Sequence, residues 1–181
     1  MPDKIRPQYE SLGVEGYYQT HGATYRNPHE KQIHVLLEDF RTELDFTKVL
    51  DLACGSGEVS LKLLEFGATV SGIDPFTAEA YHKRTGLVAE PITFEQISDG
   101  ILEERQYSLI VCSFALHLAA QSKLAVLCYQ LARISPSLLI LSPHKRPILK
   151  PEWGWELHSQ KSFERVKGRL FRSAFLEPES V

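Results

Sequence analysis

The sequence has few cysteines and lacks any long hydrophobic run. The three cysteines, Cys54, Cys112 and Cys128, are widely spaced in apolar surroundings and match neither a zinc nor a disulfide pattern, so we expect buried free thiols. No apolar run is long enough to cross a bilayer. The start, MPDKIRPQYE, lacks the apolar core of a secretory signal. We therefore expect a cytoplasmic protein with no metal site and no membrane association.

A strong charge of either sign is also missing. The formal net charge is −3 over 181 residues. Such a balance provides no global attraction to nucleic acid or to an anionic membrane. The length fits one domain with a full hydrophobic core, so we expect a single domain over residues 1–181.

What the chain does contain is a series of apolar strands that alternate with helices. This alternation predicts a doubly wound α/β fold, in which helices cover both faces of a mostly parallel sheet. Two further strands near the end have no long helix between them, which predicts a C-terminal antiparallel hairpin. The expected strands are 48–53, 68–74, 92–97, 107–113 and 137–142, with the hairpin at 153–163 and 164–176.

The N-terminal segment is rich in aromatic residues and is interrupted by glycines, so we expect short turns there. Asn27 can cap the helix that follows, Pro28 suits its first turn, and Glu30 lies three residues after the cap. We divide the chain into a lid or cap segment at 1–28, a leading helix and linker at 29–47, and a core at 48–181.

A glycine-rich loop follows the first expected strand, in the stretch VLDLACGSGEVS. Gly55 and Gly57 allow backbone N–H groups to approach a ligand closely. Asp74 ends the next strand, in the same crevice, where a carboxylate can accept both hydroxyls of a ribose. Ser60 replaces the third glycine of a dinucleotide motif, and Asp51 would repel a pyrophosphate. The loop therefore favours S-adenosylmethionine, which carries a ribose, an amine and a sulfonium, over NAD.

These stretches resemble the motifs of the class I S-adenosylmethionine-dependent methyltransferases. VLDLACGSGEVS is similar to the first motif, VSGIDPF to the second, and YSLIVCSFALHL to the fourth, whose strand end faces the reacting methyl group. The resemblance implies a seven-stranded sheet, S-adenosylmethionine as cofactor and S-adenosylhomocysteine as product. The implied cofactor-binding residues are Asp51, Ala53, Gly55, Gly57, Asp74 and Ser113, with Ser98 or Asp99 of the third motif at the adenine.

The resemblance also implies a use for the N-terminal segment, because small methyltransferases of this class commonly cap their cofactor with it. Tyr17, Tyr18 and Tyr25 would supply the apolar surface of the cap. Arg26 would then meet the methionine carboxylate of the cofactor. The alternative is a loose surface arm.

Two histidines are candidate bases. A base is needed only if the methyl acceptor must lose a proton. His117 follows the fourth expected strand, and His144 follows the fifth, at the ligand-facing edge of an open parallel sheet. Lys145 and Arg146 beside His144 could bind an acidic acceptor or be solvated loop charges.

Two further groups of residues have competing interpretations. Arg165, Lys167 and Arg169 alternate along the last strand, which favours a charged edge strand over an RNA patch. Trp153 and Trp155 belong either to the core or to an acceptor pocket. We expect a methyltransferase acting on a small molecule. The alternatives are an RNA or protein methyltransferase and a non-catalytic binding module on the same fold.

Overall fold

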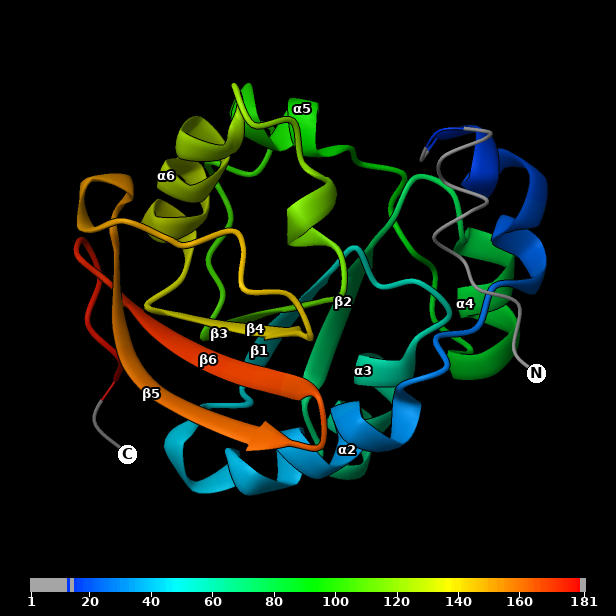
Figure 1. The fold of residues 1–181 in the computed structure, drawn as a ribbon, viewed down its shortest axis with the longest axis horizontal. Helices are drawn as coiled ribbons and strands as arrows, with labels where there is room; N and C mark the ends of the chain where they lie inside the picture. The colour runs from blue at the N-terminus through cyan, green and yellow to red at the C-terminus, as the bar shows by residue number, and fades with distance from the viewer. Residues whose placement is uncertain (1–12, 14, 180–181) are drawn as a thin grey trace.

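The computed structural model describes residues 13 and 15–179, and a six-stranded sheet forms the centre of this part of the chain (Figure 1). The strand order is β2-β1-β3-β4-β6-β5. β1 pairs in parallel with β2 and β3, β3 pairs in parallel with β4, and β6 pairs antiparallel with β4 and β5. The strands are β1 (Lys48–Leu52), β2 (Thr69–Ile73), β3 (Leu109–Ser113), β4 (Ser137–Ser142), β5 (Trp155–Phe163) and β6 (Val166–Ser173).

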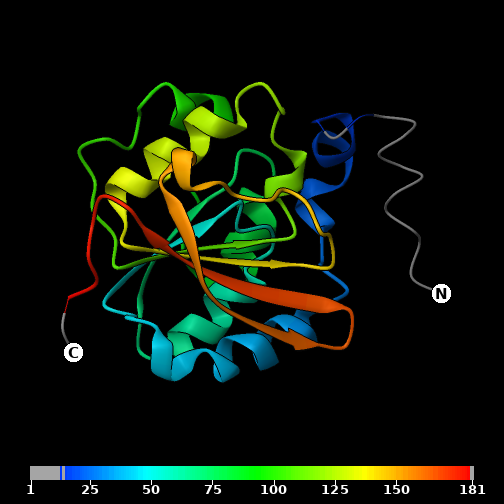
Figure 2. The same ribbon diagram turned by 60° about the vertical axis from the view of Figure 1, so that its left-hand side comes forward.

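Helices cover both faces of the sheet, as the alternating pattern predicts (Figure 2). One face packs against α2 and α3, and the other against α5 and α6. Neighbouring strand residues serve opposite faces, so Val49 packs with the α2 side while Leu50 packs with the α6 side. Each fully buried aliphatic side chain of this kind stabilises the fold by about 1.5–3 kcal/mol. The helices are α2 (Glu30–Asp39), α3 (Glu58–Glu65), α4 (Ala78–Thr85), α5 (Phe94–Ser98) and α6 (Leu124–Ile134).

The third expected strand, 92–97, is wrong, because this segment begins α5. Thr93 and Gln96 form a reciprocal capping box. The Thr93 hydroxyl accepts from the Gln96 backbone N–H at 3.2 Å, and the Gln96 side chain accepts from the Thr93 N–H at 2.9 Å. Two backbone donors are thereby satisfied at a helix start, which favours the helix. Only an isolated bridge, Ile73 with Glu90, extends the sheet beyond β2, so the expected seven strands become six in the described chain.

The N-terminal segment also differs from its prediction. Residues 1–12 and 14 of the expected lid at 1–28 lie outside the described residues. Residues 15–21 are helical rather than short turns. The Asn27 side-chain oxygen accepts from the His29 backbone N–H at 2.9 Å, forming a turn, and the helix begins only at Glu30.

The C-terminal hairpin of β5 and β6 confirms its prediction, but β6 is not an edge strand, because it lies between β4 and β5. Trp155 is a core residue, 1% exposed, and its indole N–H donates to the Cys128 carbonyl at 2.9 Å. The three cysteines are buried free thiols, as expected. None of the described helices combines the length and the apolarity needed to span a membrane.

Candidate functional site

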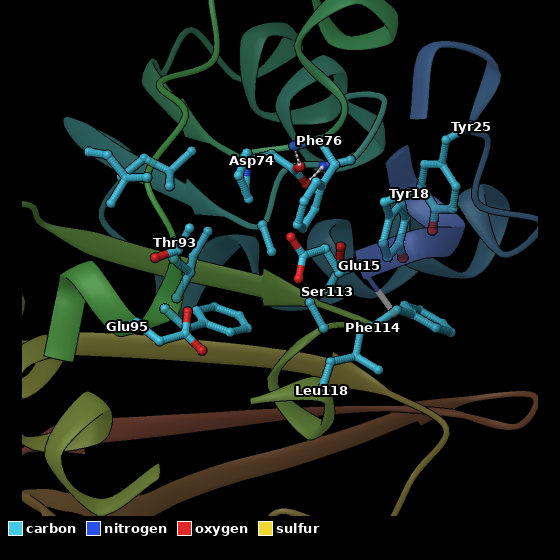
Figure 3. A pocket seen from close by; sticks show the side chains of 18 residues that line it. Glu15, Tyr18, Tyr25, Asp74, Phe76, Thr93, Glu95, Ser113, Phe114 and Leu118 are labelled. Carbon is cyan, nitrogen blue, oxygen red and sulfur yellow. Dashed lines mark hydrogen bonds between the residues drawn. The ribbon is translucent and has the colours of Figure 1, made fainter. Parts of the chain in front are cut away.

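A cavity of about 560 Å³ lies at the carboxyl ends of β1, β2 and β3 (Figure 3). Leu52, Ile73 and Ser113, the last residues of these strands, all line it. Ligands of open parallel sheets bind at this edge, and the volume suits a small organic molecule. Figure 3 shows Tyr18 and Tyr25 on one side of the cavity and Thr93 and Glu95 on the other.

The loop after β1 takes the left-handed conformation at three positions: Ala53 with φ 56°, Gly55 with φ 55° and Gly57 with φ 89°. A Cβ added to Gly57 would lie 2.4 Å from Cγ2 of Thr85, so α4 can approach the loop only because this residue is glycine. Ala53 and Gly55 line the cavity. Left-handed backbone costs about 1–2 kcal/mol for a residue with a side chain, so Ala53 is strained where the resembled motif usually has glycine.

Asp74 ties this loop to the end of β2. Its Oδ2 accepts from the Gly55 N–H at 3.1 Å, and its Oδ1 accepts from the Phe76 N–H at 2.8 Å and the Thr77 N–H at 3.1 Å. Burial raises the pKa of the Asp74 carboxyl, and the three backbone donors oppose this shift. Asp74 lines the cavity, and its carboxylate retains lone pairs that can accept from hydroxyl groups of a ligand.

Asp51 precedes Leu52 and Ala53, which line the cavity, but is itself fully buried and does not line it. Its Oδ2 accepts from the backbone N–H and the hydroxyl of Ser60 at 3.1 and 2.6 Å, and Ser60 also shares a hydrogen bond with the Tyr81 hydroxyl at 2.8 Å. Oδ1 has no hydrogen-bond partner among the described residues, and burial raises the pKa of Asp51 to about 7. An orphaned acceptor next to the glycine loop fits a ligand that carries donors and positive charge.

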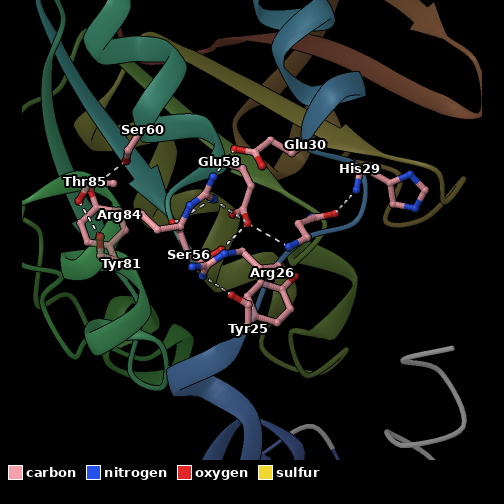
Figure 4. Close-up of polar contacts among 12 residues, drawn as sticks. Tyr25, Arg26, His29, Glu30, Ser56, Glu58, Ser60, Tyr81, Arg84 and Thr85 are labelled. Atoms are coloured by element: carbon pink, nitrogen blue, oxygen red, sulfur yellow. Dashed lines mark hydrogen bonds and ion pairs between the residues drawn. The ribbon is translucent and has the colours of Figure 1, made fainter. Parts of the chain in front are cut away.

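Glu58 connects three segments that are distant in sequence (Figure 4). Its carboxylate accepts from the Asn27 backbone N–H at 2.9 Å, from the Ser56 hydroxyl, and from Arg84 at 3.4 Å. Arg84 also pairs with Glu30 at 2.6 Å. Glu58 is only 3% exposed, so these charge-assisted contacts hold the glycine loop, α4 and the start of α2 in one arrangement.

The N-terminal segment supplies one wall of the cavity. The Tyr18 ring stacks on Phe76 with centroids 5.8 Å apart, and it meets Tyr25 edge to face at 5.4 Å. Gly22 lies so close to Phe76 that an added Cβ would be 2.1 Å from the Phe76 carbonyl oxygen. Arg26 is exposed and donates to the Tyr25 carbonyl at 2.8 Å, and it is not a lining residue.

The cavity lining carries negative charge. Glu15, Asp74 and Glu95 contribute carboxylates, and among the described residues no lysine, arginine or histidine lines the cavity. Such a wall attracts cations and repels anions. Sequence reasoning missed Glu15 and Glu95, because the glycines near Glu15 suggested turns and Glu95 was assigned to a strand.

Ser98 and Asp99, the residues expected at the adenine, do not line this cavity. The Ser98 hydroxyl is turned into its own helix, where it donates to the Phe94 carbonyl at 2.9 Å, and neither Ser98 nor Asp99 lines the cavity. Thr93 and Glu95, a few residues earlier, line it instead. The capping box at Thr93 was the available signal, because it moves the start of α5 to the cavity rim.

The two histidines meet beside the cavity. The rings of His117 and His144 have centroids 4.3 Å apart. His117 belongs to the short turn η3 (Leu116–Leu118), and the next residue, Leu118, lines the cavity. Burial, and secondarily the neighbouring His144, lowers the pKa of His117 to about 4, and its Nδ1 is buried without a partner. His144 is exposed on the loop after β4.

Comparison with solved structures defines the class of fold. The N-methyltransferase NodS from Bradyrhizobium japonicum, with S-adenosylhomocysteine bound, superimposes with a TM-score of 0.65 over 92% of this chain and 98% of that chain, at 13% identity. The magnesium protoporphyrin IX methyltransferase ChlM from Synechocystis, with S-adenosylmethionine bound, gives 0.59 over 92% and 93%, at 17% identity. The fold is therefore that of the class I methyltransferases.

Sequence comparison relates the chain to two curated proteins. No family model matches the chain. The ubiquinone biosynthesis O-methyltransferase of Pseudomonas entomophila is 29% identical over 60% of this chain and half of that protein. The uncharacterized protein C17A5.05c of Schizosaccharomyces pombe is 34% identical, with 95% of this chain and 93% of that protein covered. The chain belongs to the same family as this fission yeast protein.

Proposed function

We propose that the protein is an S-adenosylmethionine-dependent methyltransferase that acts on a small molecule, built as a single domain with residues 1–28 as a cap on the core at 48–181. The observation that carries the proposal is the acidic cavity at the ends of β1, β2 and β3, with the left-handed glycine loop and Asp74 on its wall. A ligand with a ribose, an ammonium and a sulfonium matches this wall. A dinucleotide pyrophosphate does not, because it would meet three carboxylates and no cation.

The chain's own residues would hold the cofactor as follows. Asp74 accepts from the ribose hydroxyls, and the backbone around Gly55 faces the ligand closely. Glu15 on the cavity wall, and the buried Asp51 in its ionised form, would supply negative potential toward the ammonium and the sulfonium. The bound cofactor supplies an electrophilic methyl group. Ser113 and Ala115, at the end of β3, would form the wall nearest the acceptor, and holding the reactants in line supplies most of the acceleration.

A small-molecule acceptor is favoured over RNA. Of the three cations expected to alternate along the last strand, Arg165 precedes β6. Arg169 is 8% exposed and donates to the carbonyls of His144 and Lys145, both at 3.1 Å. It is therefore not part of an exposed basic stripe that could follow a phosphate backbone.

Titration calorimetry tests the proposal with S-adenosylmethionine, S-adenosylhomocysteine and NAD as ligands. We expect saturable binding of the first two and no comparable binding of NAD. Tight NAD binding, or no binding of either adenosyl ligand, would refute it. Formation of S-adenosylhomocysteine from a pool of small-molecule acceptors would then exclude the non-catalytic binding module.

A further inference from the structure

A cluster of cations without acidic partners surrounds the histidine pair. Lys145 and Arg146 follow His144 on the loop after β4, and both are exposed. Arg169 lies beneath the same loop. No ion pair among the described residues involves any of these three cations. His117, His144, Lys145, Arg146 and Arg169, which we call the basic cluster, therefore make no ion pair with an acidic side chain among the described residues.

Arg169 is the unusual member of the basic cluster. Its two terminal nitrogens donate to the backbone carbonyls of Lys145 and His144, and its buried Nε has no hydrogen-bond partner in the described part of the chain. Burial lowers the pKa of Arg169. A cation in a buried position is costly unless a negative charge comes close. Within the described residues only dipoles of carbonyl groups meet it. An anion at the surface of this loop would supply the missing charge.

The position of the basic cluster relates it to the cavity. His117 is followed by Leu118 on the cavity wall, and the loop after β4 begins beside the end of β3. Among the described residues, the cavity lining carries three carboxylates and no cation, whereas the adjoining basic cluster has cations that form no ion pair with a carboxylate. Two neighbouring sites of opposite sign suit two ligands of opposite charge.

We propose that the basic cluster binds an anionic group, a carboxylate or a phosphate, of the methyl acceptor. This inference rests on the proposed function, because it identifies the second substrate of that reaction. His144 and the side chains of Lys145 and Arg146 contact the anion through charge-assisted hydrogen bonds. Arg169 acts as a positioning residue, because it binds the backbone carbonyls of His144 and Lys145, two of the residues whose side chains contact the anion.

Proton NMR of the histidine ring signals tests the proposal on the full chain. Citrate and inorganic phosphate serve as the two anionic probes, and glycerol and choline as neutral and cationic controls, each titrated with and without saturating S-adenosylhomocysteine. We expect saturable shifts of the His144 and His117 signals with at least one anion and none with the controls. The stronger of the two probes identifies the acceptor's anionic group as a carboxylate or a phosphate.

The double variant Lys145→Gln/Arg146→Gln should weaken anion binding about tenfold, because it removes two charge-assisted contacts. Lys83→Gln is the matched control: Lys83 is exposed on α4 and outside the basic cluster, so affinity should stay as in the unaltered protein. Absence of saturable shifts, or equal weakening by both variants, would overturn the proposal. Failure of S-adenosylhomocysteine to bind, with anion binding intact, would overturn the proposed function and leave the anion site standing.

Discussion

The backbone N–H of Gly55 donates to Oδ2 of Asp74 across 3.1 Å, so the glycine loop and the acid after β2 form one hydrogen-bonded unit. The same carboxylate also accepts from Phe76 and Thr77. Any change at Asp74 therefore acts on the shape of the loop as well as on a ligand.

Replacing Asp74 tests the cofactor site. Asp74→Ala should weaken S-adenosylmethionine binding by about 1.5–3 kcal/mol, because the ribose hydroxyls lose a charge-assisted acceptor. The melting temperature should fall too, since three backbone donors lose their partner. Asp74→Asn keeps one side-chain oxygen, so its cofactor affinity and melting temperature should lie between those of Asp74→Ala and the unaltered protein. Calorimetry and thermal unfolding measure both effects, with Glu79→Ala on the exposed face of α4 as the control. Unchanged cofactor affinity in Asp74→Ala would remove Asp74 from the binding site.

Asp51 makes stability depend on pH. Its pKa of about 7 in the folded protein lies above its ordinary value near 4. The folded state therefore binds more protons than the unfolded state between these values, and the free energy of unfolding falls as pH rises from about 4 through about 7. Asp51→Asn removes this loss. Between pH 4 and pH 8, the free energy of unfolding of Asp51→Asn should rise by about 2–4 kcal/mol relative to that of the unaltered protein. The variant should also bind S-adenosylmethionine more weakly.

Urea denaturation at pH 4, 6 and 8 measures the effect of Asp51→Asn without ligand. Ser60→Ala serves as a second variant, because it removes the hydroxyl that lowers the pKa of Asp51 and should enlarge the pH dependence. A difference between Asp51→Asn and the unaltered protein that stays constant with pH would show that Asp51 does not titrate in this range.

Gly22 tests the docking of the N-terminal wall. Gly22→Ala places a Cβ against the Phe76 carbonyl, so the segment should detach and S-adenosylhomocysteine should bind more weakly. The exposed neighbour change Ala23→Ser should leave binding unaltered. Calorimetry on both variants decides it, and equal affinities would show that the wall contributes nothing to binding.

Hydrogen exchange examines the same segment without substitution. A cap that closes on the cofactor excludes water and holds the ligand. S-adenosylhomocysteine should then increase protection over Tyr9–Tyr25 as well as over Asp51–Gly57, although Tyr9 lies outside the described residues. If protection rises at the glycine loop alone, the capping role fails.

Variants of the histidine pair test whether either ring takes part in turnover. The low pKa of His117 makes it a weak base near neutral pH, because catalytic bases work best with a pKa near the working pH. His144→Ala should lower turnover and leave cofactor affinity nearly intact. His117→Gln should cost less, and His82→Ala on α4 is the control. Steady-state kinetics with an identified acceptor measures these effects. Unchanged turnover in His144→Ala would exclude His144 as the catalytic base.

The sequence predicts the parts of the fold that repeat a regular pattern. β3 and β4 carry continuous apolar runs, β1 and β2 are short apolar-rich strands between loops and helices, and the β5–β6 hairpin follows where no helix fits. The prediction of a strand at 92–97 was wrong because the segment was assigned as one of a series of apolar strands, while the local capping box between Thr93 and Gln96 favours a helix. Local hydrogen bonds between side chains and backbone can outweigh the hydrophobic pattern of a segment, and at Thr93 and Gln96 they stabilise the helix.

The candidate site divides in a similar way. Ala53, Gly55, Asp74 and Ser113 follow from motif positions at strand ends, and all four line the cavity. The position of Glu15 on the cavity wall could not be predicted from a motif. It depends on how the N-terminal segment folds back onto Phe76, which is a long-range contact that no local pattern encodes. The basic cluster likewise depends on β6 passing beneath the loop after β4.

The contacts of Glu58 also bear on how the protein unfolds. The buried Glu58 carboxylate accepts from the Asn27 backbone N–H, the Ser56 hydroxyl and the Arg84 guanidinium. Displacement of any of these segments therefore leaves the buried charge of Glu58 without one of its partners. Breaking one partner of a buried pair costs about 3–5 kcal/mol, which exceeds the cost of fraying a loop. The glycine loop, the start of α2 and the end of α4 should therefore open as a single cooperative unit, with one shared opening rate for their amide protons.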